Sequence, residues 1–354
     1  MSKLFKYDDF LTYDEATGTY SMAQEQQVRD QTEKNHWKST GLTILKDWRL
    51  YLMLVPMLLV YLLWRYLPMY ELVSCFKNTN ATRVEDQDWY GLTNFNMLFT
   101  NKSYSDPFWQ AFRNTFITSF YGLLFGFPFP IILALFFNEI RSNVTRSILQ
   151  VCVYLPKFLS TVIVTTLIIS LFRAKGSIAD YGIISKFLVK LFGENSAVAK
   201  TAPQGLANST RYFRAIFIFS GLWEHAGYDS IVFFAAVIAV SPTSYEAAQI
   251  DGAGKMQQMR YVVIPSILST VVIMLIMKIG SLLSVGFEKV FLFCPNSEAG
   301  NYDVANVVST LANEWQTDTP KVGTAAEMIN NLIGMILVIG SNTIARKASD
   351  VSLY

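Results

Sequence analysis

The chain has 354 residues, of which 52% are hydrophobic and 16% are charged, and its formal net charge is +2. A soluble protein carries roughly a quarter charged residues because its surface must stay hydrated, so this composition is typical of a polytopic membrane protein. The charge balance shows no footprint for nucleic acid, which needs clustered basic residues. Three cysteines without a CxxC and only two histidines disfavour a disulfide framework and a histidine-based metal site.

Residues 1–46 are polar and predict a cytoplasmic N-terminal tail with one short helix at residues 21–34. We expect no cleaved signal peptide, because no apolar stretch follows a basic start. A solvated tail and a docking segment for a partner both fit this composition.

Six apolar runs predict six membrane-spanning helices in an all-α integral membrane protein, since a span needs about 20 apolar residues. The runs cover residues 50–67, 112–137, 148–172, 213–240, 266–285 and 328–344. Basic residues precede the first run (Lys46, Arg49) and follow the last (Arg346, Lys347). The positive-inside rule therefore places both termini in the cytoplasm. We expect residues 47–354, which contain all six runs, to form one membrane domain.

Three features of the runs and loops bear on packing and topology. Prolines 128 and 130 interrupt the second run, which is tolerable where neighbouring helices satisfy the freed carbonyls. The loop 173–212 is expected outside, with an amphipathic helix at 183–192, although its excess of basic residues conflicts with that side. Cys75 and Cys294 both fall on outer loops, so a disulfide between them is one possibility, whereas Cys152 is expected to pack within a span.

The loop between the fourth and fifth runs, residues 241–265, reads SPTSYEAAQIDGAGKMQQMRYVVIP. It predicts two short helices with a break at Gly252 and Gly254, which would form a stiff cytoplasmic projection. Two interpretations of Glu246 stay open. The first is a docking surface, formed with the small Ala247 and Ala248. The second is a capping box with Thr243, in which Glu246 satisfies its own helix terminus.

The spacing of Glu246-Ala247-Ala248, Gly252, Val262 and Ile264-Pro265 resembles the EAA loop of permeases from bacterial ABC importers. The extended form at 245–254 is similar to the carbohydrate branch, as are the flanking segments Leu222-Trp223, 227–231, 280–283 and 286–288. This resemblance implies the type I ABC importer permease fold in a bacterial plasma membrane. It also implies a transport subunit, and no enzyme by itself, for the import of oligosaccharides or polysaccharide fragments.

The resemblance implies that the loop couples transport to an ATP-hydrolysing partner through Glu246, Ala247, Ala248, Asp251, Gly252 and Ala253. The expected partners are an ATPase dimer that holds ATP and Mg²⁺, a second six-span permease in a heterodimer, an extracytoplasmic sugar-binding lipoprotein and membrane lipid. The chain lacks a GxxxxGK[ST] phosphate loop, so no cofactor is expected on it.

Polar residues inside the fourth and fifth runs are the candidates for contact with cargo. Lys278 is costly in lipid and should face a cavity, or pair with a neighbour at a helix contact. Further candidates on the fourth run and at the mouth of the pathway are Trp223, Glu224, His225, Tyr228, Asp229, Phe287 and Glu288. The fourth-run group also fits an ordinary helix start at the outer interface.

Three other functions compete with sugar import. The same coupling motif could serve a permease for peptides or another solute. An ion-coupled secondary transporter could use Lys278 and Asp229 as ion sites, but it would leave the glycine-broken loop unexplained. An intramembrane hydrolase would need a nucleophile or a metal set, and no such set is visible in the sequence.

Overall fold

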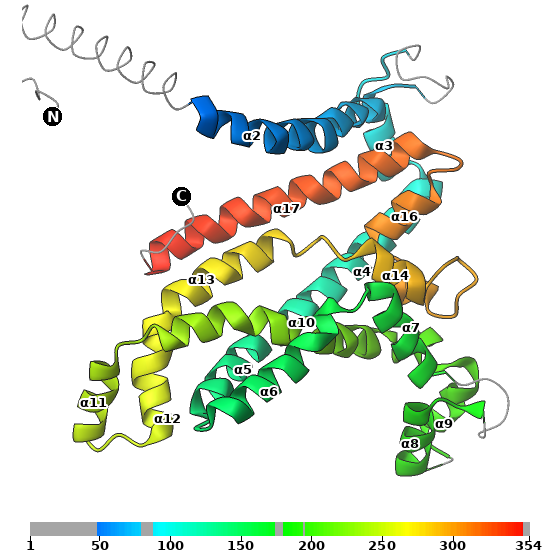
Figure 1. Cartoon of the computed structure of the whole chain (residues 1–354). Helices are drawn as coiled ribbons and strands as arrows, with labels where there is room; N and C mark the ends of the chain where they lie inside the picture. Colours follow the sequence, from blue (N-terminus) through cyan, green and yellow to red (C-terminus); the bar gives the residue numbers. More distant parts are fainter. Residues whose placement is uncertain (1–47, 79–87, 174–179, 194, 350–354) are drawn as a thin grey trace, which may run out of the picture. The chain divides into compact units, whose positions relative to one another are not determined.

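A computed structural model of the chain describes residues 48–78, 88–173, 180–193 and 195–349. Within these residues the protein is helical, and the one β-type pairing is an isolated bridge between Lys77 and Trp89. The expected all-α class is therefore confirmed for the described part of the chain (Figure 1). The tail 1–46, with the helix predicted at 21–34, lies outside the described residues.

The chain forms two compact units, residues 1–71 and 72–354. The first run begins with α2 (Trp48–Tyr61) and continues through a π-helical turn, η2 (Leu62–Tyr66), and a 3₁₀ segment, η3 (Leu67–Phe76). No residue of α2 is buried within the chain. A helix that is apolar on every face and has no covered face is suited to lipid contact.

Four helical stretches are long and apolar enough to cross a membrane: Trp48–Phe76, Lys102–Glu139, Lys255–Gly280 and Pro320–Lys347. Two bent helix pairs raise the number to six if each pair is one span. Asn143–Phe158 meets Thr161–Leu171 at 97°, and Phe213–Ile238 meets Pro242–Ile250 at 68°. By length and composition, the chain is a multi-pass membrane protein.

The third run, expected to be a span at 148–172, is a bent pair of helices. It consists of α6 (Asn143–Tyr154), a 3₁₀ turn η5 (Leu155–Phe158) and α7 (Thr161–Leu171). Pro156 lies in the turn, and Ser160 caps α7 by accepting a hydrogen bond from the Val162 amide at 3.3 Å. A proline in the turn and a new N-cap end one helix and begin another, so the predicted span consists of two helices.

The fourth run forms α10 (Phe213–Ile238), which is unbroken by its polar residues. It packs on α4 (Lys102–Gly126), α5 (Pro128–Glu139), α6 and α13 (Ile264–Gly280). Gly227 of α10 lies so close to α6 that a Cβ there would sit 2.1 Å from the Val153 carbonyl oxygen. This glycine permits the close crossing of the two helices.

The connection between the fifth and sixth runs contains three short helices, α14 (Phe287–Phe293), α15 (Tyr302–Ala305) and α16 (Val308–Glu314). The last run is α17 (Pro320–Ser349), which packs on α13, α16 and α3 (Thr93–Thr100). The loop 173–212 contains the predicted amphipathic helix as α8 (Ile183–Phe192), followed by α9 (Ala197–Thr201) and two 3₁₀ turns, η7 (Ala202–Gln204) and η8 (Leu206–Asn208).

The packing settles the earlier expectation about Cys75 and Cys294. Cys75 and Cys294 are free and buried in separate clusters, so the suggested disulfide is wrong. Cys75 instead contacts the sulfur of Met328 at 3.7 Å. Asn114 of α4 donates to the carbonyls of Asp303 and Asn306 at 2.9 and 3.0 Å, so it joins α4 to α15 and the residue that follows it.

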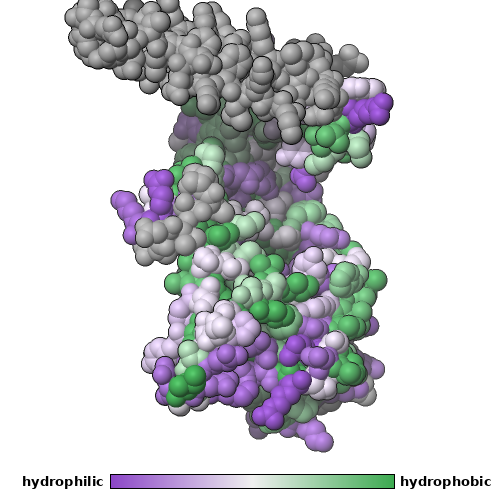
Figure 2. Space-filling model, turned by 60° about the vertical axis from the view of Figure 1, so that its left-hand side comes forward, coloured by the Kyte–Doolittle hydropathy of each residue, from purple (hydrophilic) through white to green (hydrophobic). Residues whose placement is uncertain are grey.

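Many large apolar side chains remain on the surface of the isolated chain, which suits a protein solvated by lipid and by partner subunits. Figure 2 shows these apolar side chains above a hydrophilic lower end, the end at which Figure 1 draws α11 (Pro242–Ile250) and α12 (Lys255–Gln258).

Candidate functional site

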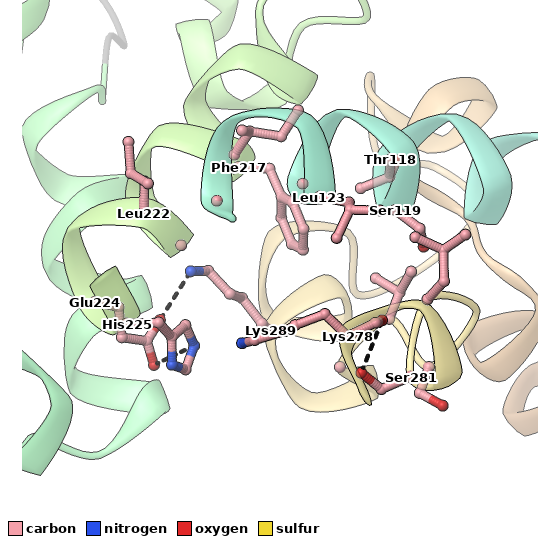
Figure 3. A pocket seen from close by; sticks show the side chains of 18 of the residues that line it. Thr118, Ser119, Leu123, Phe217, Leu222, Glu224, His225, Lys278, Ser281 and Lys289 are labelled. Atoms are coloured by element: carbon pink, nitrogen blue, oxygen red, sulfur yellow. Dashed lines mark hydrogen bonds and ion pairs between the residues drawn. The ribbon is translucent and has the colours of Figure 1, made fainter. Parts of the chain in front are cut away.

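A cavity of about 480 Å³ opens between α4, α7, α10, α13 and the start of α14. Its wall combines apolar faces, among them Phe127 and Phe217, with eleven polar side chains. These polar residues are Thr118, Ser119, Thr161, Glu224, His225, Asp229, Lys278, Ser281, Ser284, Glu288 and Lys289. Figure 3 shows the labelled part of this set, with Glu224 and His225 at one side and Thr118 and Ser119 at the other.

The buried part of the cavity wall is an ion pair between Glu224 of α10 and Lys289 of α14, 2.8 Å apart. The side chains are 3% and 9% exposed. Thr161 of α7 donates to the same carboxylate at 3.2 Å, and the ammonium lies 5.5 Å from the centre of the Phe217 ring. Helix α10 begins at Phe213, so the alternative reading of Glu224 as part of a helix start is wrong. Glu224 instead holds α7, α10 and α14 together.

His225 extends this network toward the surface. Lys157 donates to its Nδ1 at 2.9 Å, and its Nε2 lies 3.7 Å from Glu224. Because Nδ1 accepts, the proton of the neutral ring is on Nε2 and faces the carboxylate.

Asp229 of α10 and Lys278 of α13 form a second ion pair, at 2.7 Å. This pair is accessible: the lysine side chain is 42% exposed and the aspartate 23%. Lys278 therefore pairs across a helix contact and also lines the cavity, while its contact with cargo stays a prediction.

The remaining candidates divide between the cavity and other surfaces. Glu288 lines the cavity, whereas Trp223, Tyr228 and Phe287 do not. Tyr228 makes an edge contact with Phe158, and Phe287 stacks on Phe291.

Sequence reasoning missed Lys289, Thr161, Thr118 and Ser119. Lys289 stands in an otherwise apolar helix beside Glu288, which was a usable signal. Thr118 is 4% exposed, and neither its hydroxyl nor that of Ser119 has a hydrogen-bond partner in the described structure. Hydroxyls on an apolar helix carry no sequence signal that separates packing from ligand contact.

The loop 241–265 has the two helices and the break that were predicted. Helix α11 begins at Pro242 with Ser241 as its N-cap, and Gly252 adopts a positive φ of 77°. Because the helix begins before Thr243, Glu246 lies beyond the first turn, and the capping-box interpretation is wrong. Glu246, Ala247, Asp251 and Gly252 are exposed, while Ala248 and Ala253 are half-buried.

The base of this loop is anchored in the membrane domain. Tyr245 packs against a cluster of Leu135, Val237, Val263 and Ile267, which come from α5, α10, η9 (Met259–Val263) and α13. This burial raises the pKa of the Tyr245 phenol. Lys255 of α12 also pairs with Glu139 at the end of α5.

A smaller hollow of about 170 Å³ lies between α14, α15 and α16. Burial raises the pKa of the Cys294 thiol to about 11, and the nearby Glu314 carboxylate acts in the same direction. Tyr302 donates to Glu314 at 2.8 Å, and its burial also raises the pKa of the phenol. The described residues contain no cluster of metal-ligating side chains.

Comparison with known proteins agrees with this arrangement. Residues 126–293, which include the loop and most of the cavity wall, match the family of binding-protein-dependent transport system inner membrane components. Protein LplB of Bacillus subtilis is 33% identical over 87% of this chain and 92% of its own length. The polygalacturonan/rhamnogalacturonan transport system permease protein YteP of the same organism is 32% identical over 91% of this chain and 95% of its own length.

Among solved structures, a bacterial ABC transporter for import of the acidic polysaccharide alginate contains a similar chain. That chain has a TM-score of 0.74 and 32% identity, covering 89% of this chain and 99% of its own. The same transporter has been solved in complex with a periplasmic protein that holds an alginate pentasaccharide.

Within the described residues, the four to six membrane-length helices, the charged cavity and the exposed glycine-broken loop are typical of a membrane transport subunit. The chain belongs to the family of binding-protein-dependent transport system inner membrane components, which are the permease subunits of ABC importers.

Proposed function

We propose that this chain is a permease subunit that moves oligosaccharides or polysaccharide fragments into the cell. The observation that carries the proposal is the near full-length match to YteP and to the alginate importer chain. The cavity supports it, because sugars present hydroxyl edges and apolar C–H faces. The wall offers hydroxyls, charged donors and acceptors, and the rings of Phe127 and Phe217.

The proposed architecture has six spans after the tail 1–46, with both termini in the cytoplasm. Each bent helix pair would then count as one span or as a span with its loop helix. The exposed residues of the loop 241–265 would contact an ATPase dimer, which holds ATP and Mg²⁺. The tie between the loop and α5, α10 and α13 supports transmission of force from that dimer to the spans.

The proposed assembly includes a second six-span permease, with which this chain forms a heterodimer, and an extracytoplasmic sugar-binding lipoprotein. The alginate importer supports the last partner, since its structure includes a periplasmic protein with bound pentasaccharide. Membrane lipid would cover the exposed apolar helices.

A second candidate cargo is a small phosphorylated solute. The sn-glycerol-3-phosphate permease UgpA of Salmonella typhi is 26% identical over 60% of this chain. Oligosaccharide import is favoured, because YteP and the alginate chain match at higher identity over more of the sequence.

Purification of the tagged chain from native membranes in mild detergent, followed by mass spectrometry, tests the assembly. Recovery of a P-loop ATPase and a second permease is expected. The purified complex in liposomes should then take up labelled oligosaccharides only with ATP. Uptake by the lone chain without ATP would contradict the proposal and would favour an ion-coupled transporter.

A further inference from the structure

The two arms of the loop 241–265 are joined by one polar contact deep in the membrane domain. Helix α10 leads into the loop and α13 leaves it, so any movement of the loop moves one arm against the other. The Asp229–Lys278 pair is the single ion pair or side-chain hydrogen bond between α10 and α13 among the described residues. About 14 Å of helix separates Asp229 from the end of α10 at Ile238, at 1.5 Å per residue.

This contact forms the floor of the cavity. Beneath it lies a small space of about 10 Å³, closed by Phe127, Phe233 and Met274, with the Phe127 and Phe233 rings edge to face at 5.9 Å. Phe233 follows Asp229 toward the loop end of α10, and Met274 precedes Lys278 on the loop side of α13. Asp229 and Lys278 therefore lie on the wall between the cavity and this smaller space.

The pair is also placed to sense cargo. Lys278 is the more exposed member, and both charges line the cavity. Thr118 and Ser119 carry hydroxyls without partners on the α4 wall of the same cavity, and Thr118 is 4% exposed. A buried hydroxyl without a partner is costly, so these two groups indicate a ligand with hydrogen-bonding groups at this place.

The other ion pair has a different character. Glu224 and Lys289 are almost fully buried, have Thr161 as a third partner, and join α10 to α14 and α7, which are not arms of the loop. Opening that pair would leave two buried charges unsatisfied, and it would not separate α10 from α13. The accessible pair can instead exchange its partner for a ligand at little cost in desolvation.

We propose that the Asp229–Lys278 ion pair is a latch that holds the two arms of the loop together until cargo in the cavity competes for its charges. This inference rests on the proposed transport function and adds its regulation. With the latch closed, the arms keep the loop in the position that does not favour ATP hydrolysis. Contact with hydroxyl or carboxylate groups of a saccharide opens the latch and frees the arms. The saccharide shifts the equilibrium because it binds the state with the open latch more tightly than the state with the closed latch.

The test is the basal ATPase rate of the complete transporter in liposomes, without binding protein or cargo. Asp229→Asn and Lys278→Met each remove the ion pair and should raise the basal rate at least about fivefold, the lower end of usual coupling effects. The charge swap Asp229→Lys with Lys278→Asp should return the rate toward that of the wild type. Gln110→Ala, which removes an exposed contact between α4 and Asp303, is the matched control and should leave the rate unchanged.

An unchanged basal rate in both single variants would overturn the latch. An equal rise in the Gln110→Ala control would also overturn it, because loosening anywhere would then explain the effect. The assay needs no cargo, so it remains decisive even if the wild-type transporter imports no saccharide. A wild-type transporter that imports no saccharide would overturn the proposed cargo and would leave the latch untouched.

Discussion

Lys289 Nζ lies 2.8 Å from Glu224 Oε2, and the two side chains are almost completely excluded from solvent. Such a pair contributes little net stability while it is intact, because both ions have lost their hydration. Removal of one partner is a different matter, because it leaves a single charge in a medium that cannot solvate it. The pair therefore matters most for the position of α14 against α10.

Lys289→Met should destabilise the protein by about 3–5 kcal/mol, because Glu224 is then buried without a counter-ion. The double variant Glu224→Gln with Lys289→Met should recover much of that loss, since no charge remains unpaired. Thermal unfolding of the purified complex in detergent measures both variants. Equal melting temperatures for Lys289→Met and wild type would contradict the structural role of the pair.

Gly227→Ala should destabilise the crossing of α10 and α6. The added Cβ would lie 2.1 Å from the Val153 carbonyl oxygen, and backbone must move to relieve that contact. Overpacking of this kind costs about 1–3 kcal/mol. Gly122→Ala on α4 is the matched control, because no atom lies within 4 Å of its added Cβ. The same unfolding assay should separate the two, and a similar loss in both would disprove the close contact.

The thiol of Cys294 should stay protonated well above neutral pH. Its pKa is raised to about 11 by burial and by Glu314, whereas an unfolded thiol titrates near 9. Stability from this group is complete below pH 9 and is lost between pH 9 and 11, because the unfolded chain ionises first. Alkylation of Cys294, followed by mass spectrometry in a variant without the other cysteines, should therefore rise steeply only near pH 11. A midpoint near pH 9 in the folded protein would contradict the assignment.

Glu246→Lys should prevent association with the ATPase and leave the membrane domain intact. Glu246 is exposed on α11 and makes no side-chain hydrogen bond or ion pair within the described chain, so the change breaks no such contact. We expect loss of the ATPase from the purified complex, an unchanged melting temperature of the permease pair, and loss of ATP-driven uptake. Retention of the ATPase with normal uptake would show that this position does not couple the two subunits.

The sequence predicted the apolar helices, the amphipathic α8 and the glycine-broken loop, because each depends on local pattern. It did not predict the bend at 148–172, where Pro156 and the Ser160 cap divide a run whose composition alone is compatible with one helix. Lys278 and Asp229 were both singled out, but their pairing was not, since it depends on how α10 and α13 cross. Thr118 and Ser119 were missed because they are candidates only through their buried hydroxyls, which have no hydrogen-bond partner. Only the packed structure shows that these hydroxyls lack partners.

The second span passes from α4 to α5 at a joint that lacks two of the usual helical hydrogen bonds. Bending at this joint therefore breaks fewer hydrogen bonds. Pro128 and Pro130 carry no N–H, so the carbonyls of Leu124 and Gly126 lack their usual donors four residues later. Flexing at this joint therefore costs less than in an ordinary helix. The α5 segment below it is fastened to the loop through Leu135 and the Glu139–Lys255 pair, while α4 above it is fixed by Asn114. We therefore expect α5 to change its angle to α4 at this joint more easily than at other points of the span, because two backbone amide protons are missing there.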